Sequence, residues 1–162
     1  MTTLNREAEI IADPDIPTIT ITREFDATPD RVFQAWADPE LVTQWMGPRS
    51  VDMRIDTWDC RTGGSYRYSA IRDGEVIAGF YGSFHEARPG ERLVQTFTYD
   101  GFPDGVSLET MTFEALEGGR CRIVSVAVVD SMQAQAAMMS SGMEVGINEG
   151  YEKLDEILAS QA

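Results

Sequence analysis

The sequence predicts an α+β domain in which one curved antiparallel sheet wraps around a long C-terminal helix. Three observations support this prediction. Apolar residues between Ser131 and Ser160 recur at steps of three and four, which places them on one face of a helix. Residues 51–129 alternate between apolar and polar positions and are interrupted by hairpin turns, as in consecutive antiparallel strands. A sheet with one apolar face needs a cover, and only the C-terminal helix is large enough to provide it.

Composition excludes several classes of function. The chain has 162 residues, which is the size of one domain. Its 13 Lys and Arg residues against 27 Asp and Glu give a net charge of −14. This field repels phosphate backbones and anionic lipids, so we expect neither a nucleic-acid partner nor a membrane partner. The polar N-terminus contains no apolar signal core, which predicts a cytoplasmic location.

The N-terminal segment divides into an arm and a first strand. Residues 1–17 show no clean period and contain two prolines, Pro14 and Pro17, near their end, so we expect a loosely ordered arm. Residues 18–25 alternate, with threonines on one face and apolar residues on the other, which predicts a strand with one buried face. A single domain is therefore expected over residues 18–162.

Two short helices should follow this strand, because two start signals are present. Thr28-Pro29 and Asp38-Pro39 each place a capping side chain before a first-turn proline. The second helix should end at Gly47-Pro48. Helices of this length are stable only when they pack on something larger.

The middle of the chain predicts six further strands, which gives seven in total. Turn sequences such as Arg88-Pro89-Gly90-Glu91 separate them. The expected strands lie around residues 51–55, 66–68, 76–84, 93–99, 107–114 and 120–129.

The predicted C-terminal helix, over residues 131–160, carries Gly142, Gly146 and Gly150 at intervals of four. Each glycine costs about 0.8–1.0 kcal/mol relative to alanine inside a helix, so their presence requires a reason. Either another segment approaches this face closely, or the glycines leave space beside it. We expect the helix to act as the lid of a cavity, with Gly146 giving a ligand room.

Aromatic and methionine side chains are numerous and suit an adaptable apolar pocket, although each one could equally be a core residue. We expect the ligand to lie between the concave sheet face and the C-terminal helix. The apolar residues predicted to line this site are Trp45, Tyr66, Tyr68, Phe80, Phe97, Met111, Met139 and Met143.

Glu109 is the polar residue most suggestive of a site, because it shares the parity of Met111 and Phe113, which should face the core. A carboxylate there lies at the rim of a cavity, pairs with an arginine or is solvated near the strand end. Arg54 and Arg67 are candidate partners, although both fall on the opposite parity of their strands. We expect Glu109 to orient a polar group of the ligand.

No catalytic residue set, metal site or cofactor motif is predicted. His85 is the only histidine, and strict alternation places it on the outer face of its strand. The sequence contains no GxSxG motif, and its aspartates lack the spacing of a metal-binding loop. Cys60 and Cys121 lack the CxxC spacing of a metal or redox site, and we expect them to be reduced thiols.

Several segments resemble the START-like (SRPBCC) superfamily, and more narrowly its branch related to activators of heat-shock-protein-90 ATPase. The resemblance spans about residues 17–160. Its segments are ITREFDATPDRVFQAWADPELVTQWMGP, DCRTGGSYRY, GFYGSFHEARPGERLVQTF and SGMEVGINEGYEKLDEIL. It implies the helix-grip fold, in which a seven-stranded antiparallel sheet holds a long C-terminal helix with a cavity between them. Members of the superfamily bind lipids, polyketides, hormones or antibiotics, and some are cyclases or dehydratases.

The preferred hypothesis is therefore a protein that binds a small, largely apolar molecule, with no assigned reaction. The first alternative is a polyketide cyclase or dehydratase-like enzyme that uses Glu109 or a pocket tyrosine as its acid or base. The second is a co-chaperone-like or stress-linked interaction module, which would have a filled core and an exposed apolar patch. A homodimer is expected only because it is common among soluble proteins of this size.

Overall fold

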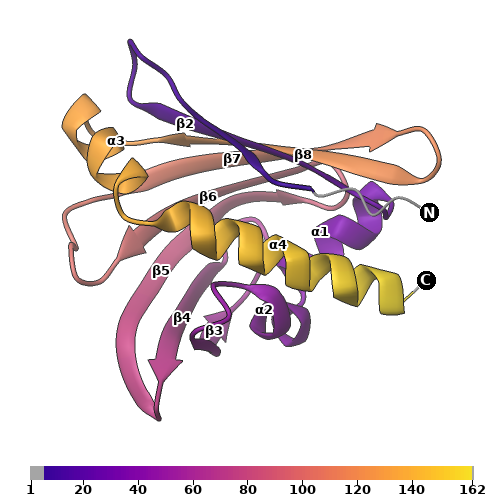
Figure 1. Ribbon diagram of the computed structural model, residues 1–162, viewed down its shortest axis with the longest axis horizontal. Coiled ribbons are helices and arrows are strands. Elements are labelled where there is room, and N and C mark those ends of the chain that lie inside the picture. Colours follow the sequence, from indigo (N-terminus) through magenta and orange to yellow (C-terminus); the bar gives the residue numbers. More distant parts are fainter. Residues whose placement is uncertain (1–5, 162) are drawn as a thin grey trace.

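The computed structural model describes residues 6–161 and confirms the α+β class and the helix-grip arrangement (Figure 1). Every pair of neighbouring strands is antiparallel, and the strand order in the sheet is β1-β2-β8-β7-β6-β5-β4-β3. The strands are β1 (Glu9–Ala12), β2 (Thr18–Phe25), β3 (Asp52–Trp58), β4 (Ser65–Arg72), β5 (Glu75–Arg88), β6 (Arg92–Tyr99), β7 (Ser107–Leu116) and β8 (Arg120–Val128). The helices are α1 (Pro29–Ala37), α2 (Pro39–Trp45), α3 (Met132–Met139) and α4 (Met143–Ser160).

The sheet has eight strands and not the expected seven, because part of the N-terminal arm pairs with the sheet. Strand β1 lies antiparallel to β2, with Ile10 opposite Ile21. A four-residue edge strand is too short to show a clear period in the sequence. Hydrogen bonds between its backbone and that of β2 order this segment. Just before β1, the backbone N–H of Ala8 donates to Asn148 Oδ1 on α4 at 2.8 Å.

Both short helices begin where the capping signals predict. The Thr28 hydroxyl accepts a hydrogen bond from the backbone N–H of Arg31 at 3.4 Å. The Asp38 carboxylate accepts one from the backbone N–H of Glu40 at 2.9 Å. In Figure 1 the two helices lie on the same side of the sheet as α4, and α2 contacts α4.

The C-terminal segment is two helices and not one, because the chain turns at Ser140–Gly142. Gly142 has φ +82° and precedes the first residue of α4, a left-handed conformation that suits glycine. Helix α3 is held elsewhere by its one buried side chain, Gln135. The Gln135 side-chain amide donates to the carbonyl oxygens of Asp13, Ile16 and Thr18 at 2.9, 3.2 and 2.7 Å. These bonds tie α3 to the β1–β2 connection and away from the axis of α4.

Burial is uneven along α4. Its buried residues are Gly150, Tyr151, Leu154 and Leu158, all in the C-terminal part of the helix. Tyr151 packs edge-on against Phe25, with ring centroids 5.4 Å apart. No residue of the segment 143–149 is buried. The sheet therefore holds α4 tightly at one end and leaves the other end open.

Arg23 forms the polar contact that holds α4 to the sheet. Its side chain, on the concave face of β2, is only 1% exposed, whereas the Asp155 side chain on α4 is 37% exposed. The guanidinium donates to both Asp155 carboxylate oxygens at 2.7 and 2.6 Å, and also to the carbonyl oxygens of Glu24 and Arg6. It also lies 4.7 Å from the centroid of the Phe25 ring. The alternation of β2 did not predict this pair.

Removing the Asp155 carboxylate should destabilise the domain, because it leaves a buried guanidinium without its counter-ion. We expect Asp155→Ala to lower the free energy of unfolding by roughly 3 kcal/mol, at the low end for a buried pair since Asp155 is partly solvated. Urea unfolding measures this loss. The double variant Arg23→Met/Asp155→Leu should recover much of it, because no unpaired charge then remains. A double variant no more stable than Asp155→Ala would contradict a charge-pair origin.

Two glycines of α4 face the end of α2 and the segment that follows it, but they differ in how closely their neighbours approach. A Cβ atom at Gly150 would lie 3.0 Å from the carbonyl oxygen of Trp45, which is tighter than ordinary packing. A Cβ atom at Gly146 would lie 3.4 Å from Cδ of Pro48, which is ordinary van der Waals contact. Close backbone approach therefore requires glycine at position 150 but not at position 146.

This difference predicts opposite responses to the same substitution. Gly146→Ala should raise the free energy of unfolding by up to about 1 kcal/mol, since alanine is the better helix former. Gly150→Ala makes the same helical gain but must displace a backbone carbonyl, so it should be less stable than Gly146→Ala by about 1–2 kcal/mol. Urea or thermal unfolding of the two variants provides a matched comparison. Equal stabilities would show that the approach to Trp45 does not require glycine.

Candidate functional site

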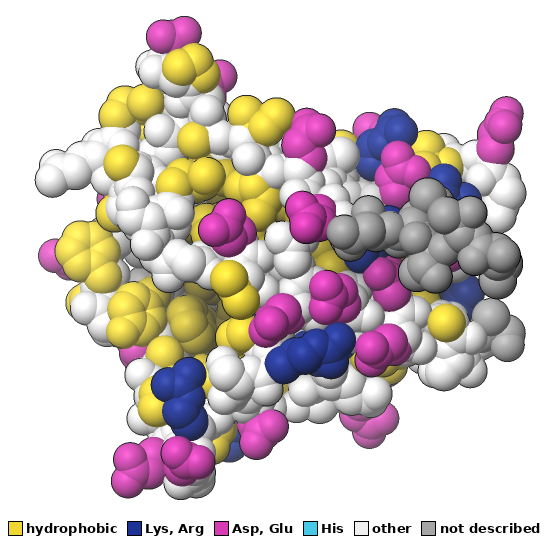
Figure 2. Space-filling view, in the orientation of Figure 1, with side chains coloured by type: hydrophobic (Ala, Val, Ile, Leu, Met, Phe, Trp, Pro, Cys, Tyr) yellow, Lys and Arg dark blue, Asp and Glu magenta, His cyan; other side chains and the backbone are white. Residues whose placement is uncertain are grey.

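The candidate site is the part of the concave sheet face that the open end of α4 leaves accessible. We call it the open concave face and define it by Phe80, Gln95, Phe97, Glu109, Met111 and Met143, all of which are only partly buried. The first five lie on strands β5, β6 and β7 at the centre of the sheet. In Figure 2 hydrophobic side chains gather beside α3 and the N-terminal end of α4, on the left of the view, where the surface is hollowed.

The apolar wall of this face is built from cross-strand aromatic contacts. The Phe80 ring stacks on Tyr68 of β4 and on Phe97 of β6, with centroids 5.1 and 5.6 Å apart. Tyr99, also on β6, lies 5.6 Å from Phe80. These residues are neighbours because alternation puts them on one face and antiparallel pairing sets them side by side. Tyr68 is buried beneath the wall, whereas Phe80 and Phe97 are partly exposed.

The polar centre of the face joins Glu109, Gln95 and Tyr66. Gln95 and Glu109 are directly paired residues of β6 and β7, and Gln95 Nε2 donates to Glu109 Oε1 at 3.0 Å. The same nitrogen donates to the Tyr66 hydroxyl oxygen at 3.4 Å. The Tyr66 O–H in turn donates to the carbonyl oxygen of Thr96 at 2.6 Å. The buried Ser107 hydroxyl, two residues before Glu109 on the same strand, has no hydrogen-bond partner within residues 6–161.

Burial shapes the electrostatics of this centre. It raises the pKa of Glu109 from 4.5 to about 7, and the Gln95 amide, followed by the nearby Ser107 hydroxyl, opposes that shift. The pKa values of Tyr66 and Tyr68 are also raised, first by burial and then by the nearby Glu109 charge. Near neutral pH the Glu109 carboxyl can therefore be either protonated or ionised, whereas both tyrosines stay protonated. Such a carboxyl can accept a hydrogen bond, donate one or transfer a proton.

No cation in the described part of the chain neutralises Glu109. The two candidate arginines pair elsewhere, Arg54 with Asp56 at 2.8 Å and Arg67 with Asp100 at 3.4 Å. His85 is exposed, which confirms its predicted place on the outer face. Cys60 and Cys121 are free thiols, and burial raises the pKa of each to about 11.

The structure brings together most of the predicted site residues. Phe80, Phe97, Glu109, Met111 and Met143 belong to the open concave face. Tyr66 and Tyr68 are buried in its base. Met139 lies on α3 and is exposed, because the chain turns after this helix and separates it from α4.

Trp45 and Gly146 lie elsewhere than we expected. Trp45 is a core residue with 4% exposure, and its ring lies 4.7 Å from that of Trp36. Its indole N–H donates to the carbonyl oxygen of Ala35 at 2.9 Å. Gly146 turns toward Pro48 of the α2–β3 connection. Alternation and helical spacing assign a residue to a face but do not reveal which neighbour covers it.

Two site residues were missed, Gln95 and Ser107. The signal that identified Glu109 was also present for Gln95, which shares the parity of Leu93 and Phe97 on a strand with an apolar face. Ser107 has the parity of Glu109 itself. A polar residue at an apolar position was therefore the informative pattern on both strands.

Two further findings bear on the type of site. Within residues 6–161, no group of three or more His, Cys, Asp or Glu side chains is placed to hold a metal ion. None of the described helices is long and apolar enough to cross a membrane.

An antiparallel sheet that holds a C-terminal helix above an accessible concave face defines a protein of the helix-grip class. Within this class, the family model described as "Activator of Hsp90 ATPase homolog 1-like protein" matches residues 26–159. The chain therefore belongs to the family of activator of Hsp90 ATPase homolog 1-like proteins. No curated protein matches the sequence.

Solved structures of similar chains support the same fold. A protein from Rhodobacter sphaeroides is 26% identical, with a TM-score of 0.84 over 95% of this chain and 99% of that chain. Protein Ms6760 from Mycobacterium smegmatis is 27% identical, with a TM-score of 0.82 over 93% of this chain and 95% of that chain. The AHSA1 protein SPO3351 from Silicibacter pomeroyi, at 18% identity, has a TM-score of 0.71 over 90% of this chain and 99% of that chain.

The raised pKa of Glu109 predicts a specific pH dependence of stability. Its pKa of about 7 lies above the value of 4.5 for an unperturbed side chain, so the folded state binds more protons than the unfolded state between these values. This contribution is fully present below pH 4.5 and is lost as the pH rises through about 7. The free energy of unfolding should fall by up to about 3 kcal/mol across this window.

Glu109→Gln should abolish this contribution, and urea unfolding at a series of pH values measures it. The control is Glu117→Gln, which removes a carboxylate at the exposed β7–β8 turn. In this control the free energy of unfolding should depend on pH as it does in the wild type. Parallel curves for wild type and Glu109→Gln would show that Glu109 titrates as an ordinary carboxyl group.

Proposed function

We propose that the protein binds a small, largely apolar molecule carrying one polar group on the open concave face. The observation that carries this proposal is the uneven burial of α4. Its C-terminal part is packed into the core, whereas Met143 and Ile147, on the same helix face about two turns and one turn before Tyr151, are only partly buried. The aromatic wall at the centre of the sheet is also only partly covered. Apolar area left accessible inside a fold favours a ligand that covers it.

The chemistry of the face supports a ligand with two parts. Phe80, Phe97 and Met111 offer flat and adaptable apolar contact. Glu109 has one carboxylate oxygen bound by Gln95, and the Ser107 hydroxyl nearby lacks a partner within residues 6–161. A hydroxyl, carbonyl or amide group of the ligand would satisfy these polar atoms and fix its orientation.

Family membership supports a fold of the ligand-binding type and does not extend to a particular ligand. A cytoplasmic location and a homodimer stay predictions from the sequence alone.

Binding can be tested with the neutral fluorescent probe N-phenyl-1-naphthylamine, which avoids repulsion by the net charge of −14. We expect saturable binding with enhanced fluorescence and a raised melting temperature. Phe97→Ala and Met111→Ala should each weaken binding by roughly tenfold, because each removes apolar contact.

Val76→Ala is the matched control, since Val76 is an exposed apolar residue at the start of β5, in the β4–β5 hairpin. It should leave the affinity unchanged. The proposal would fail if a panel of apolar metabolites gave no thermal shift. It would also fail if Val76→Ala weakened binding of the probe as much as Phe97→Ala does. Native mass spectrometry of protein from its own host could then identify a co-purifying molecule.

A catalytic role is the second candidate, because the Glu109 pKa of about 7 suits general acid–base chemistry. A cyclase or dehydratase-like reaction would use Glu109 to move a proton on the bound molecule. Glu109→Gln distinguishes the two functions once a natural ligand is known. A binding protein should release that ligand unchanged, whereas an enzyme should convert it and lose this conversion in the variant.

A further inference from the structure

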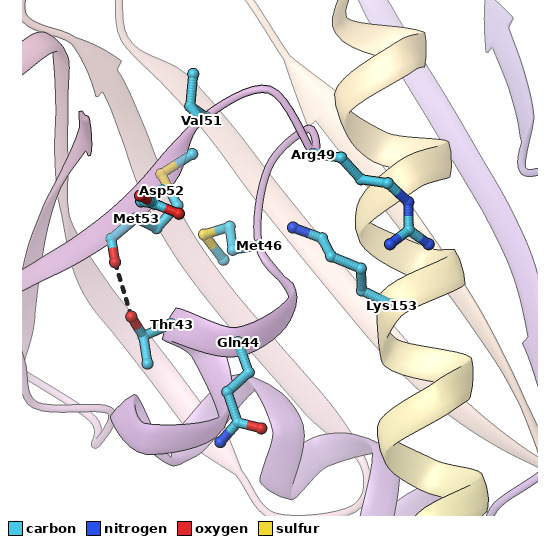
Figure 3. A pocket seen from close by; sticks show the side chains of 8 residues that line it. All are labelled: Thr43, Gln44, Met46, Arg49, Val51, Asp52, Met53 and Lys153. Carbon is cyan, nitrogen blue, oxygen red and sulfur yellow. Dashed lines mark hydrogen bonds between the residues drawn. The ribbon is translucent and has the colours of Figure 1, made fainter. Parts of the chain in front are cut away.

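A second concavity lies between β3, the end of α2 and α4. It has a volume of about 270 Å³. Its lining residues are Thr43, Gln44, Met46, Arg49, Val51, Asp52, Met53 and Lys153 (Figure 3). None of them belongs to the open concave face. The walls come from α2, β3 and the segment that joins them, and from α4, which is distant from all of these in sequence.

Two cations, Arg49 and Lys153, line this pocket, and Lys153 on α4 is the only lysine in the chain. Its side chain reaches from α4 toward β3 in Figure 3. Within residues 6–161 it makes no hydrogen bond, and no carboxylate oxygen lies within the 4.0 Å of an ion pair. Arg49 behaves differently, because its guanidinium turns along α4 to Glu152 and Glu156 at 3.6 and 3.4 Å. The pocket therefore contains one ammonium group that no carboxylate of the described residues satisfies.

Asp52 places an opposite charge on the other wall. It belongs to β3, is exposed, and has no ion pair or side-chain hydrogen bond among the described residues. Asp52 and Lys153 line the same pocket, yet they lie too far apart to pair directly. Met46 and Met53 supply thioether surface on the α2 and β3 side. The Thr43 hydroxyl donates to the carbonyl oxygen of Met53 at 2.7 Å, which ties α2 to β3.

The environment of Lys153 favours an incoming carboxylate. Burial, followed by the charge of Arg49, lowers its pKa, while the more distant carboxylates of Glu149, Asp52 and Glu156 oppose this shift. An ammonium that is partly desolvated and not directly paired gains most from a charged hydrogen-bond acceptor. An isolated anion would still have to approach a chain with a net charge of −14. A ligand with no net charge avoids that repulsion.

We propose that this pocket binds a small zwitterion, specifically an α-amino acid with an apolar side chain. Its carboxylate would bind the Lys153 ammonium, and its ammonium would face Asp52. Its side chain would pack against the methionine surface of Met46 and Met53. The ligand would thus bridge two opposite charges that the protein holds apart, and this site is separate from the open concave face.

The single lysine makes a direct test feasible. Reductive methylation with ¹³C-formaldehyde keeps the positive charge and gives one dimethyl-lysine side-chain resonance, from Lys153. Three probes separate the charge requirements: L-methionine carries both charges, N-acetyl-L-methionine only the carboxylate, and L-methioninamide only the ammonium. We expect L-methionine to shift the Lys153 resonance saturably and each half-charged analogue to bind at least about tenfold more weakly.

Variants of the two charged residues provide a second test. The affinity for L-methionine is measured from the backbone amide chemical shifts of residues 51–53 in unmethylated protein. Lys153→Met and Asp52→Asn should each weaken the binding of L-methionine by at least about tenfold. Arg88→Met and Glu117→Gln change the net charge identically at distant exposed sites and should leave the affinity unchanged.

Several results would overturn the proposal. These are no shift with L-methionine, equal binding of either half-charged analogue, or unchanged affinity in Lys153→Met or Asp52→Asn. Loss of affinity in the Arg88→Met or Glu117→Gln control would also overturn it, because the effect would then follow net charge and not the pocket.

Discussion

An ion pair between a buried arginine and a partly exposed aspartate fixes the position of the helix that this sheet holds. The Arg23 guanidinium lies on the concave face, where a charge is costly unless it is paired and hydrogen-bonded. Asp155 supplies the paired charge from α4, and the carbonyl oxygens of Glu24 and Arg6 accept further hydrogen bonds. Because this contact lies in the C-terminal part of α4, close to Tyr151 and Leu154, it fixes that end of the helix over the sheet. Because only this end of α4 is fixed, the concave face beneath the other end stays accessible.

The opposite end of α4 stands over the centre of the sheet without being buried. The turn at Gly142 and the three carbonyl contacts of Gln135 hold α3 at the β1–β2 connection, so α3 does not continue the cover. Apolar side chains there remain partly exposed, and Glu109 remains beside Gln95 without a cation. A carboxyl group in this position has a raised pKa because the surrounding protein disfavours its charge. The same asymmetry thus produces both the apolar wall and the perturbed carboxyl group.

Local patterns were sufficient for much of the fold. The capping residues Thr28 and Asp38 start their helices as predicted, since a cap is satisfied by its own next turn. Alternation located the central strands and put Glu109 on the inward face. The same reasoning failed for Trp45, which pairs with Trp36 in the core, and for Gly146, which meets Pro48. An inward-facing residue can be covered by a helix, by a loop or by nothing, and its own sequence neighbourhood does not differ among these cases.

The sequence by itself determined the class of fold, the order of its central strands, the two capped helices and the inward face of Glu109. These features depend on residues within a few positions of one another. Only the tertiary structure decided that the C-terminal segment divides at Gly142, that Arg23 pairs with Asp155 and that Asp52 and Lys153 share a pocket without meeting. Each of these depends on where α3 and α4 lie relative to strands and loops distant in the sequence. That placement results from long-range packing, which a local period does not encode.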